Sequence, residues 1–381
     1  MVPMIFLMIS ILLGMICGGN IDKLFLILSG FLLYRYCFYK GQMWKDKYKQ
    51  YLIGLLTGYL LVIVLILCLQ YRVQDKDIAI NYVENQKTAI VLVLEGEPAT
   101  YNLPMAIKNF RQKNKLSFIN LPFQLYKNKY NYSKISSINT DYYYDYFEEE
   151  IKKEMEYQYP IYIAYLYNRP YMKEVLQEAI QEGNDKLMIV PVLLSESKSF
   201  QLMNEVIKEV NPLQYKVKIK NSFPLWDSEA LAQSFVDKIS QQVNVKEKSR
   251  VGILLVGEHD LKDINSNQNI KQEILFKEKV KDLLIKEGYS EPQIRLTPLK
   301  AKEIHMQLER LFEYGIKEVV VMQVSSATEN IENRMIISQA IDDAEVPQYV
   351  SINFSSGWLY NDTLILELVR RIQLLNIQNW D

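Results

Sequence analysis

The stretch Arg250 to Lys262, RVGILLVGEHDLK, joins a short apolar run to an abrupt polar end. Val251 to Val256 is rich in branched aliphatic residues and is bounded by charge, which is typical of a buried β-strand. His259 follows the run directly, at the carboxyl end of the expected strand, where open α/β sheets bind their ligands. It is one of only two histidines in 381 residues. The stretch predicts a buried strand that presents a metal-handling histidine.

The composition of the chain changes at about residue 71. Residues 1–71 are strongly apolar, whereas residues 72–381 have the composition of an ordinary charged globular protein. The net charge is −1, from 44 basic and 45 acidic side chains, so bulk electrostatics do not favour nucleic acid as a partner. All three cysteines, Cys17, Cys37 and Cys68, lie in the apolar part. The remainder therefore offers neither a disulfide framework nor a thiolate metal site.

Three apolar runs in the first 71 residues predict membrane-spanning helices, at about residues 2–18, 24–39 and 52–70. The third run comes close to the roughly 20 residues that a helix needs to cross a bilayer. Arg35 interrupts the second run, so the expected number of spans is two or three. No Lys or Arg precedes the first run, which distinguishes it from a secretory signal. We expect an integral protein of the cell membrane, with the lipid bilayer as a partner.

The loop between the second and third runs is basic. It contains Lys40, Lys45, Lys47 and Lys49, opposed only by Asp46. The positive-inside rule places such a loop in the cytoplasm, and the residues after the third run then lie on the outer face.

Beyond residue 80, buried-type strands alternate with helices. Strands are expected near residues 88–94, 162–166, 187–194, 215–219, 251–256, 293–296, 319–324 and 349–352. Helices are expected near residues 103–113, 147–157, 170–181, 199–210, 226–242, 271–287 and 300–314, and from residues 330 and 362 onward. The Tyr-rich segment 126–146 shows no clear periodicity. Continuous apolar strands joined by helices form parallel sheets that are covered on both faces.

The two halves of this region resemble each other. TAIVLVLEGEP (88–98) recurs loosely as RVGILLVGEHD (250–260), and KLMIVPVLLSESKSF (186–200) as EVVVMQVSSATEN (318–330). We therefore predict an α/β protein with two similar doubly wound parallel-sheet lobes that face each other across a cleft. The expected domains are a membrane anchor at 1–71, an N-terminal lobe at 72–245 and a C-terminal lobe at 246–381.

Residues 86–375 resemble the ferrochelatase family of the class II chelatase superfamily, enzymes that insert ferrous iron into a porphyrin. The resemblance rests on the turn Gly96-Glu97-Pro98, on Pro170 at a helix start, and on the stretch Phe223-Pro224-Leu225-Trp226. His259 matches the active-site histidine of that family, and Glu332 matches the glutamate of its second motif. The resemblance implies chelatase-like lobes in which His259 and Glu332 are catalytic residues and metal ligands.

The resemblance also implies contacts to the substrate by five residues, namely Glu95, Gly96, Pro98, Tyr167 and Ser195. The chain departs from the family pattern in several places. At the positions of Glu95 and Tyr167, the family more often has other residues. The proline expected three residues after His259 is Lys262, and Asn330 stands where the second motif has a histidine.

The chemistry of metal insertion suits these side chains. A neutral imidazole can accept a pyrrole proton or bind a divalent metal ion near neutral pH. A neighbouring carboxylate can hold the imidazole in one tautomer or relay protons outward. Nitrogen and oxygen ligands suit Fe²⁺, which is expected as a substrate, with no tightly bound cofactor.

Three functions remain open on the sequence. The first is a membrane-anchored ferrochelatase, a lyase acting on protoporphyrin or coproporphyrin, and the family analogy then favours the cytoplasm for the soluble part. The second is a non-catalytic chelatase-like module that binds a tetrapyrrole or a metal ion. The third is a chelatase for another tetrapyrrole or for cobalt or nickel; those relatives usually have two histidines, and only His259 is at hand here.

Overall fold

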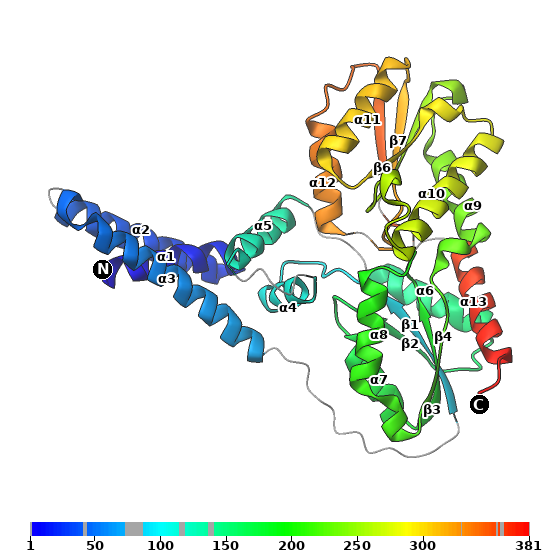
Figure 1. Cartoon of the computed structure of the whole chain (residues 1–381), viewed down its shortest axis with the longest axis horizontal. Helices are drawn as coiled ribbons and strands as arrows, with labels where there is room; N and C mark the ends of the chain where they lie inside the picture. The colour runs from blue at the N-terminus through cyan, green and yellow to red at the C-terminus, as the bar shows by residue number, and fades with distance from the viewer. Residues whose placement is uncertain are drawn as a thin grey trace. The chain divides into compact units, whose positions relative to one another are not determined.

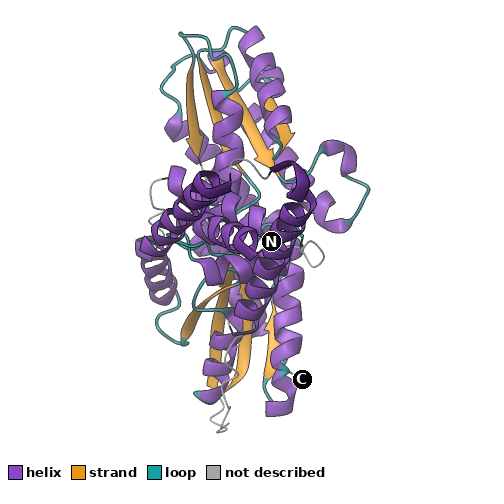
Figure 2. Ribbon diagram, turned by 90° about the vertical axis from the view of Figure 1, so that its left-hand side faces the viewer, coloured by secondary structure: helices purple, strands orange, loops and turns teal. Residues whose placement is uncertain are grey.

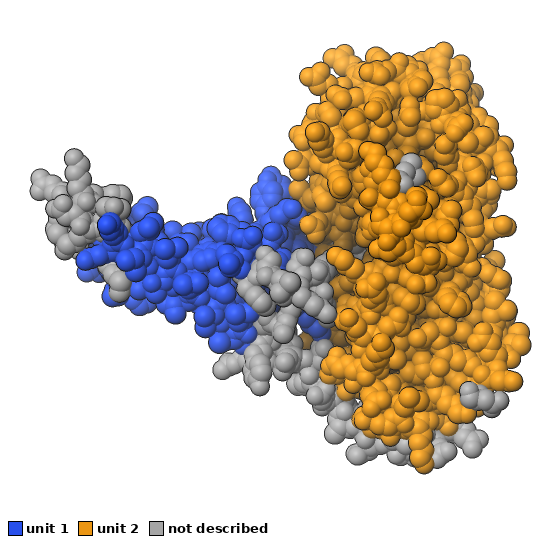
Figure 3. All heavy atoms as spheres, in the orientation of Figure 1, with its two compact units in different colours: residues 1–75, 98–138 blue, residues 76–97, 139–381 orange. Residues whose placement is uncertain are grey.

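The computed structural model describes residues 2–40, 44–72, 87–113, 119–135, 141–328, 330–355, 357–358 and 362–380. The chain divides into two compact units, coloured separately in Figure 3. Unit 1 contains residues 1–75 and 98–138, and unit 2 contains residues 76–97 and 139–381. Residues 98–138 thus group with the N-terminal helices, although the chain enters this segment directly from a strand of unit 2.

Unit 2 contains two parallel four-stranded sheets with the same strand order (Figures 1 and 2). The first sheet has the order β2-β1-β3-β4 and the second β6-β5-β7-β8. Every pairing between these strands is parallel. The strands are β1 (Lys87–Leu94), β2 (Ile161–Tyr165), β3 (Asn184–Pro191), β4 (Lys218–Asn221), β5 (Val251–Gly257), β6 (Ile294–Pro298), β7 (Glu318–Gln323) and β8 (Ser351–Ser355). The predicted α/β class with two repeated parallel-sheet lobes is confirmed.

Helices cover both faces of each sheet, as parallel strands require. They are α6 (Asp141–Glu154), α7 (Met172–Gln181), α8 (Lys198–Val210), α9 (Glu229–Gln242), α10 (Gln268–Lys286), α11 (Ala301–Glu313), α12 (Ile331–Asp342) and α13 (Asp362–Ile377). In the N-terminal lobe, built on β1 to β4, α7 and α8 pack on one face, while α6, α9 and α13 pack on the other. In the C-terminal lobe, built on β5 to β8, α11 and α12 cover one face and α10 the other.

The core continues from one lobe into the other. Phe235 of α9 contacts Phe276 of α10 edge to face, with ring centroids 5.3 Å apart, and lies 6.4 Å from the ring of Trp358. The last helix, α13, follows the C-terminal lobe in sequence but packs beside β3 and α6 of the N-terminal lobe (Figure 1). Its buried Arg371 donates to the carbonyls of Phe223 and Pro224. The two lobes therefore share one apolar core.

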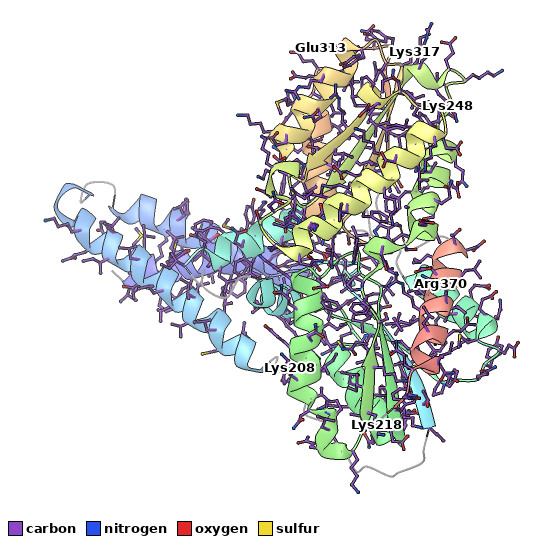
Figure 4. The ribbon with its side chains drawn as sticks, turned by 45° about the vertical axis from the view of Figure 1, so that its right-hand side comes forward. Lys208, Lys218, Lys248, Glu313, Lys317 and Arg370 are labelled. Atoms are coloured by element: carbon purple, nitrogen blue, oxygen red, sulfur yellow. The ribbon has the colours of Figure 1, made fainter. Side chains whose placement is uncertain are left out.

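The carboxyl ends of both sheets point toward each other. Lys248 and Lys317, which precede β5 and β7, lie at one extremity of unit 2 in Figure 4. Lys218, the first residue of β4, lies at the opposite extremity. Since all strands are parallel within their sheets, the strand ends that carry Glu95 and His259 meet at the junction of the lobes. This arrangement places ligand-binding loops where parallel sheets have them.

Unit 1 contains α1 (Val2–Ile16), α2 (Asn20–Lys40), α3 (Trp44–Arg72), α4 (Leu103–Lys113) and α5 (Leu121–Lys134). Helices form at all three apolar runs. Among the described residues, one helix is long and apolar enough to cross a membrane, over the 21 residues Lys49–Leu69 with mean hydropathy 2.9. Val2–Ile16 is apolar but shorter. The number of spans stays a prediction.

Within the segment 126–146, residues 126–134 and 141–146 are helical, although the sequence shows no clear periodicity. Its first part lies in α5 and its last part in α6. Leu121 and Leu125, one turn apart, bury the inner face of α5, and Phe147 and Ile151 do the same for α6. Polar and Tyr-rich positions surround these short apolar pairs, so the helical period is hard to see. The side chains of residues 142–146 lie outside those that the structure describes.

Candidate functional site

Strand β5 places His259 where the sequence predicts it. Val251 to Gly257 is completely buried, and the chain turns out of the sheet immediately after Gly257. The imidazole of His259 is half-buried, with 23% of its side chain exposed. It is therefore anchored by a rigid central strand and still reachable from solvent.

A buried carboxylate of α10 holds the imidazole. The Nδ1 atom of His259 lies 2.8 Å from Oε2 of Glu273, and the backbone N–H of His259 donates to Oε1 of the same carboxylate at 3.2 Å. An Nδ1–H that donates to Glu273 leaves the lone pair on Nε2 of the ring. Carboxylates orient metal-binding histidines in this way.

Lys277 completes the arrangement one helical turn further along α10. Its Nζ lies 3.1 Å from Oε1 of Glu273 and donates to the backbone carbonyl of His259 at 2.9 Å. The Lys277 and Glu273 side chains are 1% and 3% exposed. A buried ion pair of this kind costs desolvation energy unless further hydrogen bonds compensate. Here both charged groups also form hydrogen bonds with His259, and these bonds offset part of the desolvation cost.

The charges of the three groups depend on one another. The hydrogen bond to Glu273 raises the pKa of His259, and burial opposes this rise only in part. Burial alone would raise the pKa of Glu273, but the hydrogen bond from His259 and the charge of Lys277 hold it below its ordinary value. Glu273 is therefore the stable anion of the group, and His259 is more basic than a free imidazole.

Gly257 makes this packing possible. A Cβ atom at this position would lie 2.1 Å from Oε1 of Glu273 and 2.8 Å from Nζ of Lys277. Both distances are far below van der Waals contact, so a side chain at residue 257 would displace the ion pair. The requirement for glycine at position 257 is therefore steric, and the sequence alone did not reveal it.

Glu258 adds a second carboxylate beside His259. One ligand atom from each of Glu258, His259 and Glu273 lies within 4.8 Å of the others. Glu258 is exposed and Glu273 is buried. Imidazole nitrogen with carboxylate oxygen is a ligand set for divalent transition metals such as Fe²⁺ or Zn²⁺. Among the described residues, this group is the candidate metal centre.

The carboxylate that contacts His259 is Glu273, not the expected Glu332. Glu332 is exposed in the first turn of α12 and is not part of the candidate metal centre. Asn330 serves as the N-cap of α12: its Oδ1 accepts from the N–H of Asn333 at 3.1 Å. A helix cap is a structural role that asparagine fills well. The participation of Glu332 in metal insertion stays a prediction.

Glu95, at the end of β1, joins the two lobes. Its Oε1 accepts a hydrogen bond from Ser199 Oγ of α8 at 2.6 Å. Its Oε2 lies 2.8 Å from Ser326 Oγ, on the loop that follows β7 in the C-terminal lobe. Tyr167, which is buried, lies 3.3 Å from Ser199 through its hydroxyl. We call Glu95, Tyr167, Ser199 and Ser326 the serine clasp.

Gly96 fits against Tyr165, the last residue of β2, and Asn168, which follows the strand. Its φ of +73° lies in the left-handed region, and an added Cβ would lie 2.7 Å from Cδ1 of Tyr165. Next to it, Oε2 of Glu97 accepts from Nδ2 of Asn330 at 3.3 Å, a second bond between the lobes. Pro98, the next residue, begins the segment that belongs to unit 1. Glu95 and Tyr167, two of the positions expected to bind substrate, are thus engaged in contacts within the protein. Substrate binding by these positions stays a prediction.

Ser195 also lies at the junction of the lobes. Its Oγ donates to Oδ1 of Asn269 on α10 at 2.5 Å. The adjacent Glu196 and Gln272 form a reciprocal pair: Gln272 accepts from the Glu196 N–H at 2.8 Å and donates to its carboxylate at 2.9 Å. One helix, α10, therefore holds His259 through one set of side chains and the N-terminal lobe through another.

Glu273, Lys277 and Gly257 are the residues of the candidate site that the sequence analysis missed. A signal for two of them was present. The buried positions of α10 follow the helical period, and Glu273 and Lys277 occupy two of them among Ile270, Ile274 and Val280. Opposite charges four residues apart on an apolar helix face indicate a buried ion pair rather than a solvated surface.

The comparison with protein families addresses the N-terminal lobe. Residues 142–242 match the CbiX family. This segment runs from α6 to α9 and includes Tyr167 and Ser195, while His259 lies outside it. A member of the chelatase superfamily was expected, and the match over these residues supports that superfamily. Membership of the ferrochelatase family stays a prediction. No curated protein matches the chain.

Several solved structures are similar to the chain at low sequence identity. SirB from Bacillus subtilis with Fe³⁺ is 15% identical, with 76% of this chain and 96% of SirB covered and a TM-score of 0.48. The sirohydrochlorin chelatase SirB from Bacillus subtilis subspecies spizizenii in complex with cobalt is 12% identical, with coverages of 75% and 94% and a TM-score of 0.44. CbiX, described as the terminal enzyme for biosynthesis of siroheme in denitrifying bacteria, is 12% identical, with coverages of 76% and 98% and a TM-score of 0.43.

Proposed function

We propose that this protein is a membrane-anchored chelatase that inserts a divalent metal ion into a tetrapyrrole at the carboxyl end of β5. The observation that carries the proposal is the group formed by His259, Glu258 and Glu273, in which a buried carboxylate fixes the imidazole. The CbiX match of residues 142–242 supports the same reaction class. Fe²⁺ is the expected metal substrate.

Each residue of the group has a role that follows from its surroundings. Glu273 keeps the proton of His259 on Nδ1, so that Nε2 is the atom that receives the metal ion or a pyrrole proton. Lys277 neutralises Glu273 and fixes the backbone of His259. Glu258, being exposed, is the carboxylate that an arriving metal ion meets first. Proton uptake by His259 is favoured by its raised pKa.

Two classes of tetrapyrrole are candidate substrates. Ferrochelatases act on protoporphyrin or coproporphyrin, whereas the solved CbiX is described as an enzyme of siroheme biosynthesis. The CbiX match makes sirohydrochlorin the first substrate to test, and the porphyrins the second.

Metal insertion by the full chain in detergent tests the proposal. Under anaerobic conditions with Fe²⁺ or Co²⁺, the absorbance of sirohydrochlorin, coproporphyrin or protoporphyrin is expected to shift to that of the metal complex. His259→Ala should abolish the reaction, while His305→Ala should not. His305 is the matched control because it is the other histidine and pairs only locally, with Glu309 at 3.1 Å on α11. Absence of metal insertion with all three tetrapyrroles would overturn the proposal.

A binding module without turnover is the alternative, and one observation favours it. Asn330, which stands where a second motif histidine was expected, caps α12 and contacts Glu97 instead of presenting a metal ligand. Tight tetrapyrrole binding without metal insertion would select this alternative.

We further propose that the soluble part lies in the cytoplasm, where a chelatase would find its substrate; the charge bias of the loop before Lys49 favours the outer face. A reporter fused after Asp381 distinguishes the two. Reporter activity on the outer face would support the binding module over the enzyme.

A further inference from the structure

The segment between β1 and α6 differs sharply in charge from the rest of the chain. Residues 98–138 contain no Asp or Glu. Their basic residues are Lys108, Arg111, Lys113, Lys115, Lys127, Lys129 and Lys134. The whole chain is nearly neutral, with a net charge of −1. Nothing in the proposed chelatase chemistry uses this concentration of positive charge.

The segment packs on the N-terminal helices through its apolar residues. Ile107 of α4 and Leu121 and Leu125 of α5 are buried in one cluster with Val62 and Ile66 of α3. Lys129 fixes α5 to the first turn of α2 through Asp22, with Nζ and Oδ2 2.8 Å apart. The segment is therefore an integral part of the unit that contains the apolar helix Lys49–Leu69.

The opposite face of α5 exposes a stripe of aromatic side chains. Phe123, Tyr126 and Tyr130 are 53%, 41% and 45% exposed, and Ile119, just before the helix, is 73% exposed. The spacing of four, three and four residues places these side chains along one side of a helix. Lys134 lies over the Tyr130 ring, with Nζ 5.4 Å from the centroid. An exposed stripe of this kind, beside basic residues, has the composition of a membrane-interface helix.

The level at which α5 meets α3 agrees with this interpretation. The apolar window of α3 ends at Leu69. Tyr59 of α3 contacts the stripe directly: its hydroxyl donates to the carbonyl of Ile119, and its ring centroid lies 6.0 Å from that of Phe123. At 1.5 Å per residue, Ile66 and Tyr59 lie about 5 and about 15 Å before Leu69. Interfacial helices bury their apolar face to a depth of about 5–10 Å, so the contacts between α5 and α3 cover that depth and extend below it.

We propose that residues 98–113 and 119–135 form a membrane-surface element whose aromatic stripe, Ile119, Phe123, Tyr126 and Tyr130, inserts among anionic lipid headgroups beside α3. The positive charge of the segment and its lack of acidic residues match an anionic surface. The covering of the stripe by lipid also accounts for the exposure of four large apolar and aromatic side chains on one helix. The proposal rests on the proposed membrane anchor, with α3 crossing the bilayer, and does not depend on whether the protein inserts metal.

Depth-dependent fluorescence quenching tests the proposal. The full chain carrying Phe123→Trp is reconstituted into vesicles of phosphatidylcholine with phosphatidylglycerol, and its emission is compared with that of the wild-type chain. Phe223→Trp is the matched control, because Phe223 is 74% exposed on unit 2. For Phe123→Trp, we expect phosphatidylcholine brominated near the headgroup to quench the added emission at least about twofold more than in the control, and iodide in the water to quench it less.

Two outcomes would overturn the proposal. Equal access of iodide to both introduced indoles would place α5 in water. If neither iodide nor brominated lipid quenched the emission of the indole at position 123, a protein partner, such as a second copy of this chain, would cover it. Tyr126→Trp on the same stripe serves as a second reporter if Phe123→Trp does not fold.

A charge substitution tests the anionic headgroups separately. Lys127→Glu/Lys134→Glu should reduce the bromolipid quenching of the Phe123→Trp chain in vesicles that contain phosphatidylglycerol. Lys208→Glu/Lys218→Glu makes the same charge change at exposed positions of unit 2, marked in Figure 4, and should leave it unchanged. An equal effect of both pairs would contradict recognition of the lipid surface by this segment.

Discussion

The ends of β1 and β5 occupy the same place in two lobes of identical strand order, yet they carry different chemistry. At β1, Glu95 is held by the hydroxyls of Ser199 and Ser326 and ties one lobe to the other. At β5, His259 rests on a buried Glu273–Lys277 ion pair and keeps part of its ring exposed. The comparison teaches that strand order fixes where a site can lie. The strand end that is followed by a helix with a buried ion pair is the candidate metal centre.

The largest effect is expected from Lys277→Met, which removes the cation beneath the β5 site. Glu273 would then be buried without its ion-pair partner, and losing one partner of such a pair typically costs about 3–5 kcal/mol. Thermal or denaturant unfolding of the full chain in detergent, followed by tryptophan fluorescence, measures this loss. Lys281→Met is the control on the same helix, since its partner Glu291 is solvent-exposed. Equal losses in both variants would contradict the assigned role of Lys277.

Gly257→Ala should disturb the Glu273–Lys277 ion pair from the side of β5. An added Cβ would collide with Glu273 and Lys277, and overpacking of this kind costs about 1–3 kcal/mol. Gly252→Ala is the matched control in β5, because its Cβ would lie 2.8 Å from Ile316 Cδ1, away from the site. Both variants should lose stability, but only Gly257→Ala should also weaken metal binding. Intact metal binding in Gly257→Ala would be evidence against the Glu273 contact.

Glu95→Gln addresses the other strand end. Replacing the carboxylate of the serine clasp removes its charge, and hydrogen bonds to charged groups contribute about 1.5–3 kcal/mol, of which the amide retains a part. We expect a loss of stability of about 1–2 kcal/mol with unchanged metal affinity, measured by unfolding and by metal titration. Glu209→Gln, on the exposed end of an ion pair with Lys173, is the control. If Glu95→Gln lowered the affinity for metal, the β1 end would also contribute to the metal centre, and the contrast between the two strand ends would be wrong.

The smallest effect is a pH dependence. Because the folded-state pKa of His259 is raised above its ordinary 6.5, its interaction with Glu273 stabilises the protein fully below that value. The contribution is lost as the pH rises through the folded-state pKa. The stability difference between the wild type and His259→Ala should therefore shrink from mildly acidic to mildly alkaline pH. A difference that grows with pH would contradict the raised pKa.

Much of the fold was predictable from the sequence because the central strands of both sheets, β1, β3, β5 and β7, carry continuous apolar runs. Val251 to Gly257 is buried at every position, so the pattern needs no tertiary information. The segment 98–138 behaved differently. Its helices are held by a few apolar residues such as Ile107, Leu121 and Leu125, whose partners lie on α1 and α3. Only the folded structure brings those partners together.

Of the two side chains in contact at the candidate site, His259 and Glu273, the sequence predicted only the histidine. His259 was found because it follows a strong strand, whereas its carboxylate lies 14 residues further along the chain. Glu332 matched a family motif in sequence, but helix α12 leaves its side chain exposed. Motif spacing identifies which residue types are present; it does not determine which two of them the packing of a helix brings into contact.

The comparison of the two strand ends is tested most directly by titrating the full chain in detergent with Co²⁺, whose visible absorption reports its ligands. Wild type and Glu95→Gln are expected to bind Co²⁺ with the same affinity. His259→Ala should lose the spectrum, and Glu273→Gln should bind about 10–100-fold more weakly, as expected when the partner of a ligating histidine is removed. Unchanged Co²⁺ binding by His259→Ala would contradict the assignment of the metal centre to the end of β5.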